Sequence, residues 1–225
     1  MQFKKEHLLL YAVTDRAFTG RQSLYEQIRD ALSGGATMIQ LREKHLDEAS
    51  FLKEAILVKK LCSAYRAPLI INDNLTVALQ SSADGIHVGA GDTPVEEIRR
   101  QCGRDFIIGA TAKTVEQAKA AEAQGADYLG AGAVFSSSTK ENALRITKET
   151  LREICASVSI PVVAIGGIRQ SNITELAGCG MCGFSVESAI FAADDRKAAA
   201  EQLKRKAAAL AAGSAASNER LWRTP

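Results

Sequence analysis

The sequence alternates short apolar runs with amphipathic stretches along nearly its whole length. Eight of the apolar runs have the length and continuous hydrophobicity of strands buried in a parallel sheet, and helical patterning follows them. Repeated strand–helix units align their strands side by side and parallel, so this pattern limits the possible folds more than any other feature of the chain. The predicted strands span residues 8–13, 38–41, 69–71, 85–88, 106–108, 128–131, 162–165 and 184–186.

Eight strand–helix units favour a closed barrel over an open sheet. A doubly wound open sheet typically has fewer strands and carries a glycine fingerprint after the first one, which is absent here. The length of 225 residues suits one barrel domain. We therefore predict an α/β fold with a single domain, a (β/α)8 or TIM barrel over residues 1–211, followed by a flexible C-terminal tail over residues 212–225.

Capping boxes mark several of the expected helix starts. A serine or threonine stands three residues before a glutamate or glutamine at residues 23–26, 93–96 and 114–117. The second of these also has Pro94 at the predicted first helical position, where proline is well tolerated. These signals predict helices after the first, fourth and fifth strands.

Composition excludes several classes of partner and location. The 28 Lys and Arg against 26 Asp and Glu leave a net charge of +2, too small to favour a nucleic acid or an acidic membrane as partner. No apolar run is long enough to span a bilayer, and residues 1–7 lack the features of a signal peptide. The five scattered cysteines favour a reducing cytoplasm over a disulfide framework. A homo-oligomer remains possible.

Polar side chains gather where the predicted strands end. In a barrel of this kind the carboxyl ends of the strands, with the loops that follow them, form the active site. The strand bodies are apolar, so the polar residues at these ends form a concentrated set. They are Thr14, Asp15, Gln40, Arg42, Lys44, Asn72, Asp73, Asp92, Thr111, residues 136–140 and Ser188, with a glycine pair at 166–167.

Asp73 and Asp92 follow neighbouring strands and are candidate ligands of Mg2+. Carboxylate oxygens suit this cation, which needs only one or two of them when a phosphate supplies further oxygens. Asn72 adds an amide beside them. A purely structural interpretation is also open, in which Asp92 helps to cap the next helix and Asp73 occupies a turn.

Arg42, Lys44 and Lys140 form a candidate site for a pyrophosphate. Arg42 and Lys44 are expected on one face because side chains alternate along a strand. Several cations beside a divalent metal match the charge that develops on a leaving diphosphate. Solvated surface charge is the alternative.

A second, weaker anion site is predicted from residues 136–139 and 166–167. Loops after the late strands of such barrels commonly bind phosphate through hydroxyls and backbone N–H groups. Two anion sites would imply two phosphorylated substrates. Other signals carry less: Cys179 and Cys182 form an isolated C-x-x-C before the eighth strand, and the three histidines make no metal-ligand cluster.

The motifs at these strand ends resemble those of the thiamine-phosphate synthase family. The matching segments are Tyr-Ala-Val-Thr-Asp at 11–15, Ile-Gln-Leu-Arg-Glu-Lys at 39–44, Ile-Asn-Asp at 71–73, Asp-Gly-Ile-His-Val-Gly at 84–89, Asp-Tyr-Leu-Gly-Ala-Gly at 127–132, Ser-Thr-Lys at 138–140 and Ala-Ile-Gly-Gly-Ile at 164–168. The resemblance implies Mg2+-assisted transfer of a hydroxymethylpyrimidine unit from its diphosphate to the nitrogen of a thiazole phosphate, with release of pyrophosphate.

The resemblance also implies a role for each matching residue. Asp73 and Asp92 would bind Mg2+, and Arg42, Lys44 and Lys140 would be catalytic through the leaving diphosphate. The pyrimidine diphosphate would contact Gln40, Arg42, Lys44, Asn72, Thr111 and Lys140. The thiazole phosphate would contact Ser137, Thr139, Gly167, Glu187 and Ser188, and Glu43 and Ser138 are further expected substrate-binding residues. In the mechanism that the family suggests, pyrophosphate leaves first and the thiazole nitrogen captures a pyrimidine cation.

The chain departs from the usual family pattern at Ala90, Thr111, Ala133, Ser136–Ser137 and Glu187. The hydroxyl exchanges keep the hydrogen-bond chemistry, but a carboxylate at Glu187 would repel a phosphate unless the backbone N–H does the binding. Two alternatives stay open. One is a thiazole tautomerase on the same fold, whose histidine after the fifth strand is replaced here by Lys113. The other is a non-catalytic barrel that binds phosphorylated ligands.

Overall fold

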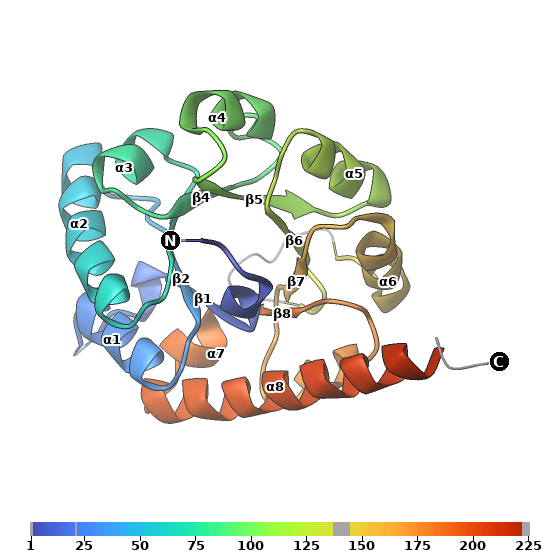
Figure 1. Cartoon of the computed structure of the whole chain (residues 1–225). Coiled ribbons are helices and arrows are strands. Elements are labelled where there is room, and N and C mark those ends of the chain that lie inside the picture. Colours follow the sequence, from blue (N-terminus) through green and yellow to red (C-terminus); the bar gives the residue numbers. More distant parts are fainter. Residues whose placement is uncertain (1, 21, 137–144, 222–225) are drawn as a thin grey trace.

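Eight parallel strands close into one barrel, in which each strand pairs with its neighbours in the chain and β8 pairs with β1 (Figure 1). The computed structural model describes residues 2–20, 22–136 and 145–221, with the backbone alone for residues 212–221. The predicted (β/α)8 barrel is confirmed. The strands are β1 (Leu10–Val13), β2 (Met38–Leu41), β3 (Leu69–Asn72), β4 (Gly85–Val88), β5 (Ile107–Ala112), β6 (Tyr128–Gly132), β7 (Val162–Ile165) and β8 (Gly183–Val186).

Helices form a ring outside the strands (Figure 1). The α-helices are α1 (Leu24–Ser33), α2 (Glu48–Ala64), α3 (Leu75–Gln80), α4 (Val95–Cys102), α5 (Val115–Ala123), α6 (Lys148–Ser157), α7 (Ser188–Phe191) and α8 (Arg196–Leu221). Short 3-10 helices are η1 (Lys5–Leu8), η2 (Arg16–Phe18) and η3 (Ile173–Leu176).

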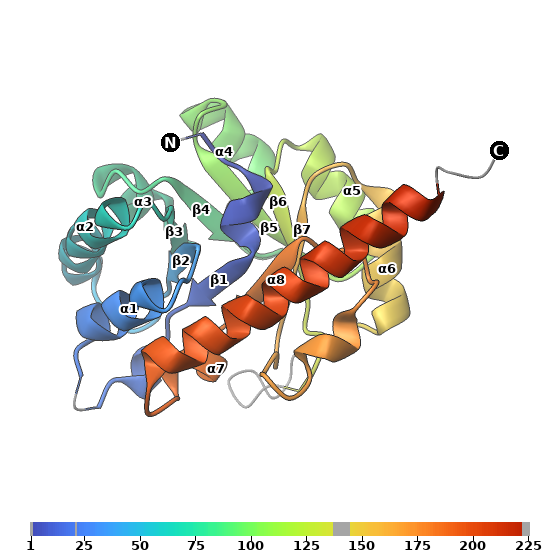
Figure 2. The ribbon, with the colours of Figure 1, turned by 60° about the horizontal axis from the view of Figure 1, so that its bottom comes forward.

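The connection between β7 and β8 contains only η3, so the prediction of a helix after every strand is wrong at this point. Four glycines in this connection, at positions 166, 167, 178 and 180, have positive φ angles, so α-helical geometry is interrupted on both sides of η3. The long helix α8 packs against both α1 and η3 and so covers the side of the barrel that η3 leaves thin (Figure 2).

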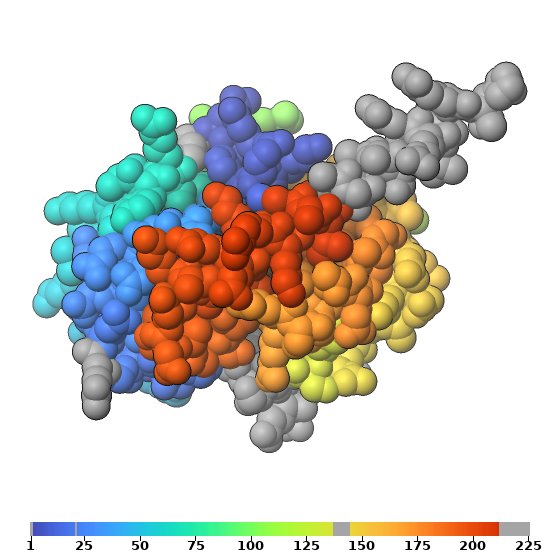
Figure 3. Space-filling model, turned by 90° about the horizontal axis from the view of Figure 1, so that it is seen from below, coloured from blue at the N-terminus to red at the C-terminus, as the bar shows by residue number. Residues whose placement is uncertain are grey.

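Helix α8 fills the surface between α1 and the elements around β7 (Figure 3). Its backbone remains helical through Leu221, so the tail predicted from residue 212 begins inside α8, and its flexibility stays a prediction. Across the described part of the chain, no helix is both long enough and apolar enough to cross a membrane.

Side chains that point outward from the strands pack against the helices, and those that point inward fill the barrel. The inner layer at the amino ends of the strands consists of Leu8, Tyr11, Met38, Ile70, Ile107, Tyr128 and Val163. Phe3 lies with its ring centroid 5.8 Å from that of Tyr128 and closes this end together with η1. The sequence pattern assigned Leu8 to the first strand, but Leu8 ends η1 and is fully buried in this layer.

The capping predictions hold at two of the three helix starts. The Ser23 hydroxyl accepts a hydrogen bond from the Glu26 N–H, and the Glu26 carboxylate accepts one from the Ser23 N–H, so the two residues form a capping box. Thr114 caps α5 through the Gln117 N–H. At the start of α4, however, Pro94 is the cap residue itself rather than the first helical residue, and no side chain caps the helix.

Arg99 links α4 to the loops at the amino ends of β5 and β6. Its guanidinium donates to the carbonyl oxygens of Gly103, Phe106 and Gly125 at 2.6 to 3.0 Å and to the Asp127 carboxylate at 2.6 Å. Asp127 in turn accepts from the Ile108 N–H at 2.7 Å. One side chain therefore satisfies several backbone acceptors on the face opposite the strand carboxyl ends.

Replacing Arg99 by methionine is expected to lower the free energy of unfolding by about 2–3 kcal/mol, because carbonyl and carboxylate partners lose their donors while the apolar stem is kept. Thermal or urea unfolding measures the loss. The matched control is Arg100→Met, since Arg100 is exposed and makes no described ion pair. Equal stability of the two variants would contradict a structural role for Arg99.

Candidate active site

The carboxyl ends of the strands bring most of the predicted site residues to one rim of the barrel. Loops after β1, β2 and β3 meet there through polar contacts between Arg42 and Asp15 and between Lys44 and Asp73, and the loop after β4 brings Asp92 beside Asp73. Ser137, Ser138, Thr139 and Lys140 lie outside the described residues. Of the three cations predicted for the diphosphate site, Arg42 and Lys44 lie within the described residues.

Asp73 and Asp92 lie close enough for their carboxyl groups to share a hydrogen bond. Burial and the neighbouring Asp73 carboxyl raise the pKa of Asp92, against a 2.7 Å hydrogen bond from the Gly89 N–H that lowers it. Burial alone would raise the pKa of Asp73, but hydrogen bonds from Lys44 and with Asp92 and Asn72 bring it below its ordinary value. Two adjacent carboxyls repel each other unless a proton or a cation lies between them, so this pair fits a divalent cation.

Within the described ranges, no group of three or more His, Cys, Asp or Glu side chains could hold a metal ion. Two carboxylates alone are a poor site for zinc, which prefers nitrogen and sulfur ligands. They suit Mg2+, which keeps several of its waters and takes further oxygens from phosphate. Asp73 and Asp92 are therefore the described residues that could hold Mg2+ together with a phosphate group.

Arg42 and Lys44 both line a depression at the rim, together with Asp15 and His45. The reason differs from the prediction, because β2 ends at Leu41 and strand alternation does not extend to these two residues. The loop is held instead by the Arg42 N–H, which donates to the Thr14 hydroxyl at 2.9 Å. Arg42 then pairs loosely with Asp15 at 3.4 Å, while Lys44 forms a close ion pair with Asp73.

Glu43, predicted to contact substrate, has a side chain that is 2% exposed and turned toward Arg16. Arg16 binds its carboxylate through two hydrogen bonds of 2.8 and 2.9 Å and also pairs with Glu54 at 2.5 Å. The bidentate pair raises the pKa of Arg16, and burial raises that of Glu54. In this arrangement Glu43 supports the loop that carries Arg42 and Lys44, and no motif in the sequence indicated Arg16.

A buried chain of polar side chains crosses the barrel beneath the rim. It connects Gln40 on β2 with Thr111 on β5 through the hydroxyls of Tyr11 and Tyr128 and the ring of His87. Gln40 and Thr111 were predicted to bind the pyrimidine diphosphate, whereas the two tyrosines stood in matching segments without a predicted role. Two aromatic hydroxyls among otherwise aliphatic strand positions were the available signal.

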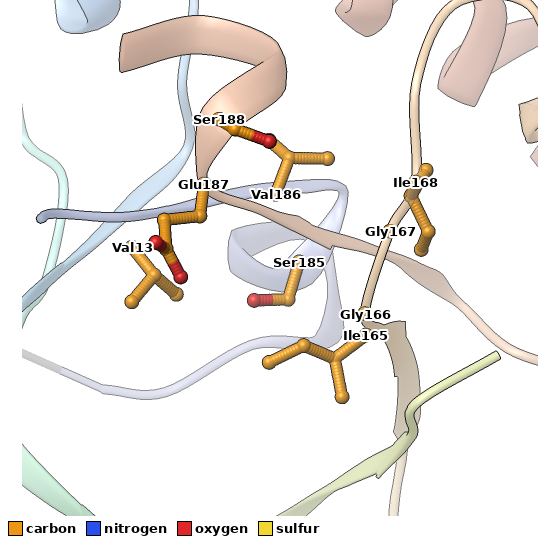
Figure 4. A pocket seen from close by; sticks show the side chains of 9 residues that line it. All are labelled: Val13, Ile165, Gly166, Gly167, Ile168, Ser185, Val186, Glu187 and Ser188. Atoms are coloured by element: carbon orange, nitrogen blue, oxygen red, sulfur yellow. The ribbon is translucent and has the colours of Figure 1, made fainter. Parts of the chain in front are cut away.

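A small pocket of about 50 Å3 lies at the ends of β7, β8 and β1 (Figure 4). Its wall includes the Gly166–Gly167 turn and the start of α7 at Ser188. Gly167 has a φ of +64°, and a side chain there would lie 2.3 Å from the Ser136 carbonyl oxygen, which explains the glycine. Glu187 points into the pocket beside Val13, so the carboxylate that departs from the family pattern does face this space (Figure 4).

Residues 10–190 match the family model described as thiamine monophosphate synthase. The thiamine-phosphate synthase of Ruminiclostridium cellulolyticum is 45% identical over 86% of this chain and 92% of its own length. That of Clostridium acetobutylicum is 44% identical over 84% of this chain and 89% of its own length. A solved structure of a thiamine phosphate pyrophosphorylase from Pyrococcus furiosus superposes with a TM-score of 0.85 at 38% identity, covering 92% of this chain and 98% of that one.

Proposed function

The chain belongs to the thiamine monophosphate synthase family, and from this membership we infer that it makes thiamine phosphate. The substrates would be 4-amino-2-methyl-5-hydroxymethylpyrimidine diphosphate and 4-methyl-5-(2-hydroxyethyl)thiazole phosphate, and pyrophosphate would be released. The observation that carries this function is the carboxylate pair Asp73–Asp92 beside Lys44 and Arg42, at the carboxyl ends of adjacent strands. We expect the reaction to take place in the cytoplasm.

Asp73 and Asp92 are the residues that would hold Mg2+, and the bound ion would supply positive charge to the diphosphate. The carboxylates are already drawn together, and Lys44 partly neutralises them. Arg42 lies a short distance along the same loop and would donate to the outer oxygens of the diphosphate. This side of the site therefore stabilises negative charge that builds up on the leaving group.

The bond to pyrophosphate would break before the new carbon–nitrogen bond forms. The thiazole nitrogen carries its own lone pair and needs no base to become a nucleophile, so leaving-group stabilisation is the main demand on the protein. The described rim meets that demand with cations and carboxylates. Its composition supports the synthase over a tautomerase, which depends on a proton-transfer residue, and over a barrel that only binds ligands.

The phosphate group of the thiazole phosphate would lie at the pocket formed by the ends of β7 and β8. Backbone N–H groups at the Gly166–Gly167 turn and at Ser188 are the donors for its phosphate. The Glu187 carboxylate faces the same pocket, so we expect the phosphate to sit toward the glycine turn rather than toward Glu187. The proposed substrate site also includes four residues that lie outside the described part of the chain: Ser137, Ser138, Thr139 and Lys140.

Purified protein incubated with both substrates and Mg2+ should release pyrophosphate and form thiamine phosphate in equal amounts. Leaving out either the thiazole phosphate or Mg2+ should abolish product formation. A protein that binds both substrates without releasing pyrophosphate would support the binding-only alternative. Isomerisation of a thiazole without any diphosphate would support the tautomerase.

Mg2+ should also be detected without turnover. With inorganic pyrophosphate present, adding MgCl2 at about ten times its dissociation constant should stabilise the fold by about 1.4 kcal/mol, which corresponds to a rise in melting temperature of roughly 3–6 °C. Asp92→Asn should remove this rise while pyrophosphate alone still shifts the melting temperature. An unchanged magnesium effect in that variant would place the ion elsewhere.

A further inference from the structure

Five side chains form one continuous hydrogen-bond chain inside the barrel. The Gln40 amide lies 2.6 Å from the Tyr11 hydroxyl, which lies 2.8 Å from the Tyr128 hydroxyl. The Tyr128 hydroxyl lies 3.1 Å from Nδ1 of His87, whose Nε2 lies 3.0 Å from the Thr111 hydroxyl. Gln40, Tyr11, Tyr128 and His87 are each at most 6% exposed. Hydrogen bonds to water therefore cannot replace those within the chain.

The orientation of Gln40 determines the direction of every other hydrogen bond. Its Nε2 donates to the Tyr11 oxygen, so the Tyr11 hydrogen passes on to Tyr128. The Tyr128 hydrogen then needs Nδ1 of His87 as its acceptor. This places the single hydrogen of a neutral His87 ring on Nε2, from which it is donated to Thr111. The Thr111 hydrogen is left over, and in the described part of the chain it has no acceptor.

The chain has one other fully satisfied setting. If the Gln40 amide is turned over, its oxygen accepts from Tyr11, and all the later hydrogens reverse until Thr111 donates to His87. Mixed settings leave a buried donor or acceptor unpaired, which costs about 1–3 kcal/mol for each group. A doubly protonated ring would place a positive charge on a side chain that is only 6% exposed, at a greater cost. The hydrogen-bond roles of Gln40 and Thr111 are therefore coupled across the barrel.

We propose that Tyr11, Tyr128 and His87 are positioning residues that make Gln40 an acceptor and Thr111 a donor toward the substrate. This inference rests on the proposed function, because it takes the pyrimidine diphosphate as the ligand of both ends. Diphosphate oxygens only accept hydrogen bonds, so they select the setting in which Thr111 donates. The coupling then obliges Gln40 to present its oxygen, which accepts from an amino group of the pyrimidine and rejects an acceptor at the same place.

The position of the hydrogen on His87 is a direct test that needs no turnover. The chain has three histidines, so nitrogen-15 spectra of the wild type and of His87→Gln identify the His87 signals. We expect the form with hydrogen on Nε2 in protein bound to inorganic pyrophosphate and Mg2+. Hydrogen on Nδ1, or on both nitrogens, would overturn the proposal.

Interrupting the chain should weaken discrimination between ligands rather than binding in general. Tyr11→Phe and Tyr128→Phe each remove one hydroxyl and keep the ring. In both variants KM for the natural pyrimidine diphosphate should rise about threefold to tenfold, the value of one hydrogen bond. The preference for this substrate over an analogue with an oxo group in place of the amino group should fall about tenfold, because Gln40 can then turn over.

The matched control is Ile70→Val, which trims a side chain in the same buried layer without touching the hydrogen-bond chain. It should change stability but leave the preference between amino and oxo ligands unchanged. A preference unaltered in both tyrosine variants would overturn the coupling, even if both variants were less stable. Failure of the wild type to release pyrophosphate would instead remove the proposed function itself, and the two failures are thus distinguishable.

Discussion

Replacing Asp73 by asparagine is expected to slow pyrophosphate release at least about a hundredfold, equivalent to about 2.7 kcal/mol of transition-state stabilisation. Asp73 contacts both Asp92 and Lys44, so its carboxylate connects the proposed metal with the cationic side of the site. Without that charge a divalent ion would keep one carboxylate, and Lys44 would lose its partner. Both changes weaken the stabilisation of the leaving group.

Asparagine is a better substitution than alanine at this position. The φ angle of Asp73 is +62°, in the left-handed region that asparagine and aspartate tolerate better than other residues with a side chain. Asp73→Asn therefore removes the charge with little added backbone strain. Steady-state rates at saturating Mg2+ measure the effect, and Asp105→Asn, an exposed site in the loop before β5, is the control. A rate within a fewfold of the wild type would exclude Asp73 from the metal site.

Replacing Gly109 by alanine is expected to destabilise the fold by about 3 kcal/mol or more. A Cβ atom at this position would lie 2.1 Å from the ring of Tyr128 and 2.3 Å from its hydroxyl oxygen. The ring cannot easily move, because it is fully buried and its hydroxyl bonds both Tyr11 and His87. Relief of the overlap would therefore break the buried hydrogen-bond chain or open the strands.

Denaturant unfolding measures this loss, and Gly20→Ala is the matched control because a Cβ at Gly20 would meet nothing within 4 Å. That control should stay within about 0.5 kcal/mol of the wild type, as surface substitutions usually do. If Gly109→Ala has the same denaturant midpoint of unfolding as the wild type, the barrel interior can accommodate an extra methyl group beside Tyr128. The inference that the Tyr128 ring cannot move would then be wrong.

The barrel itself was predictable because its signals are local. A buried parallel strand needs a short apolar run and its helix needs an amphipathic stretch, so the order of units can be read along the chain. The absence of an α-helix between β7 and β8 was not predictable, because glycines that permit positive φ also occur in ordinary turns. The compensating contact of α8 with η3 joins residues far apart in the sequence, and no local pattern indicates it.

The rim residues were predictable for a related reason. Parallel strands end at one edge of a barrel, so Asp73, Asp92, Arg42 and Lys44 could be expected together once the strands were identified. Their individual partners could not. Glu43 is a carboxylate in the same loop as Arg42 and Lys44, yet its side chain is only 2% exposed and is paired with Arg16.

The order of strands and helices, the family and the chemical types available at the strand ends can all be read along the chain. Which of these groups face one another follows only from the closed barrel: the Asp73–Asp92 pair, the hydrogen bonds of Arg16 to Glu43 and the chain from Gln40 to Thr111. The physical reason is that secondary structure depends on neighbours within a few residues, whereas charge pairing and buried hydrogen bonds depend on distances across the closed barrel.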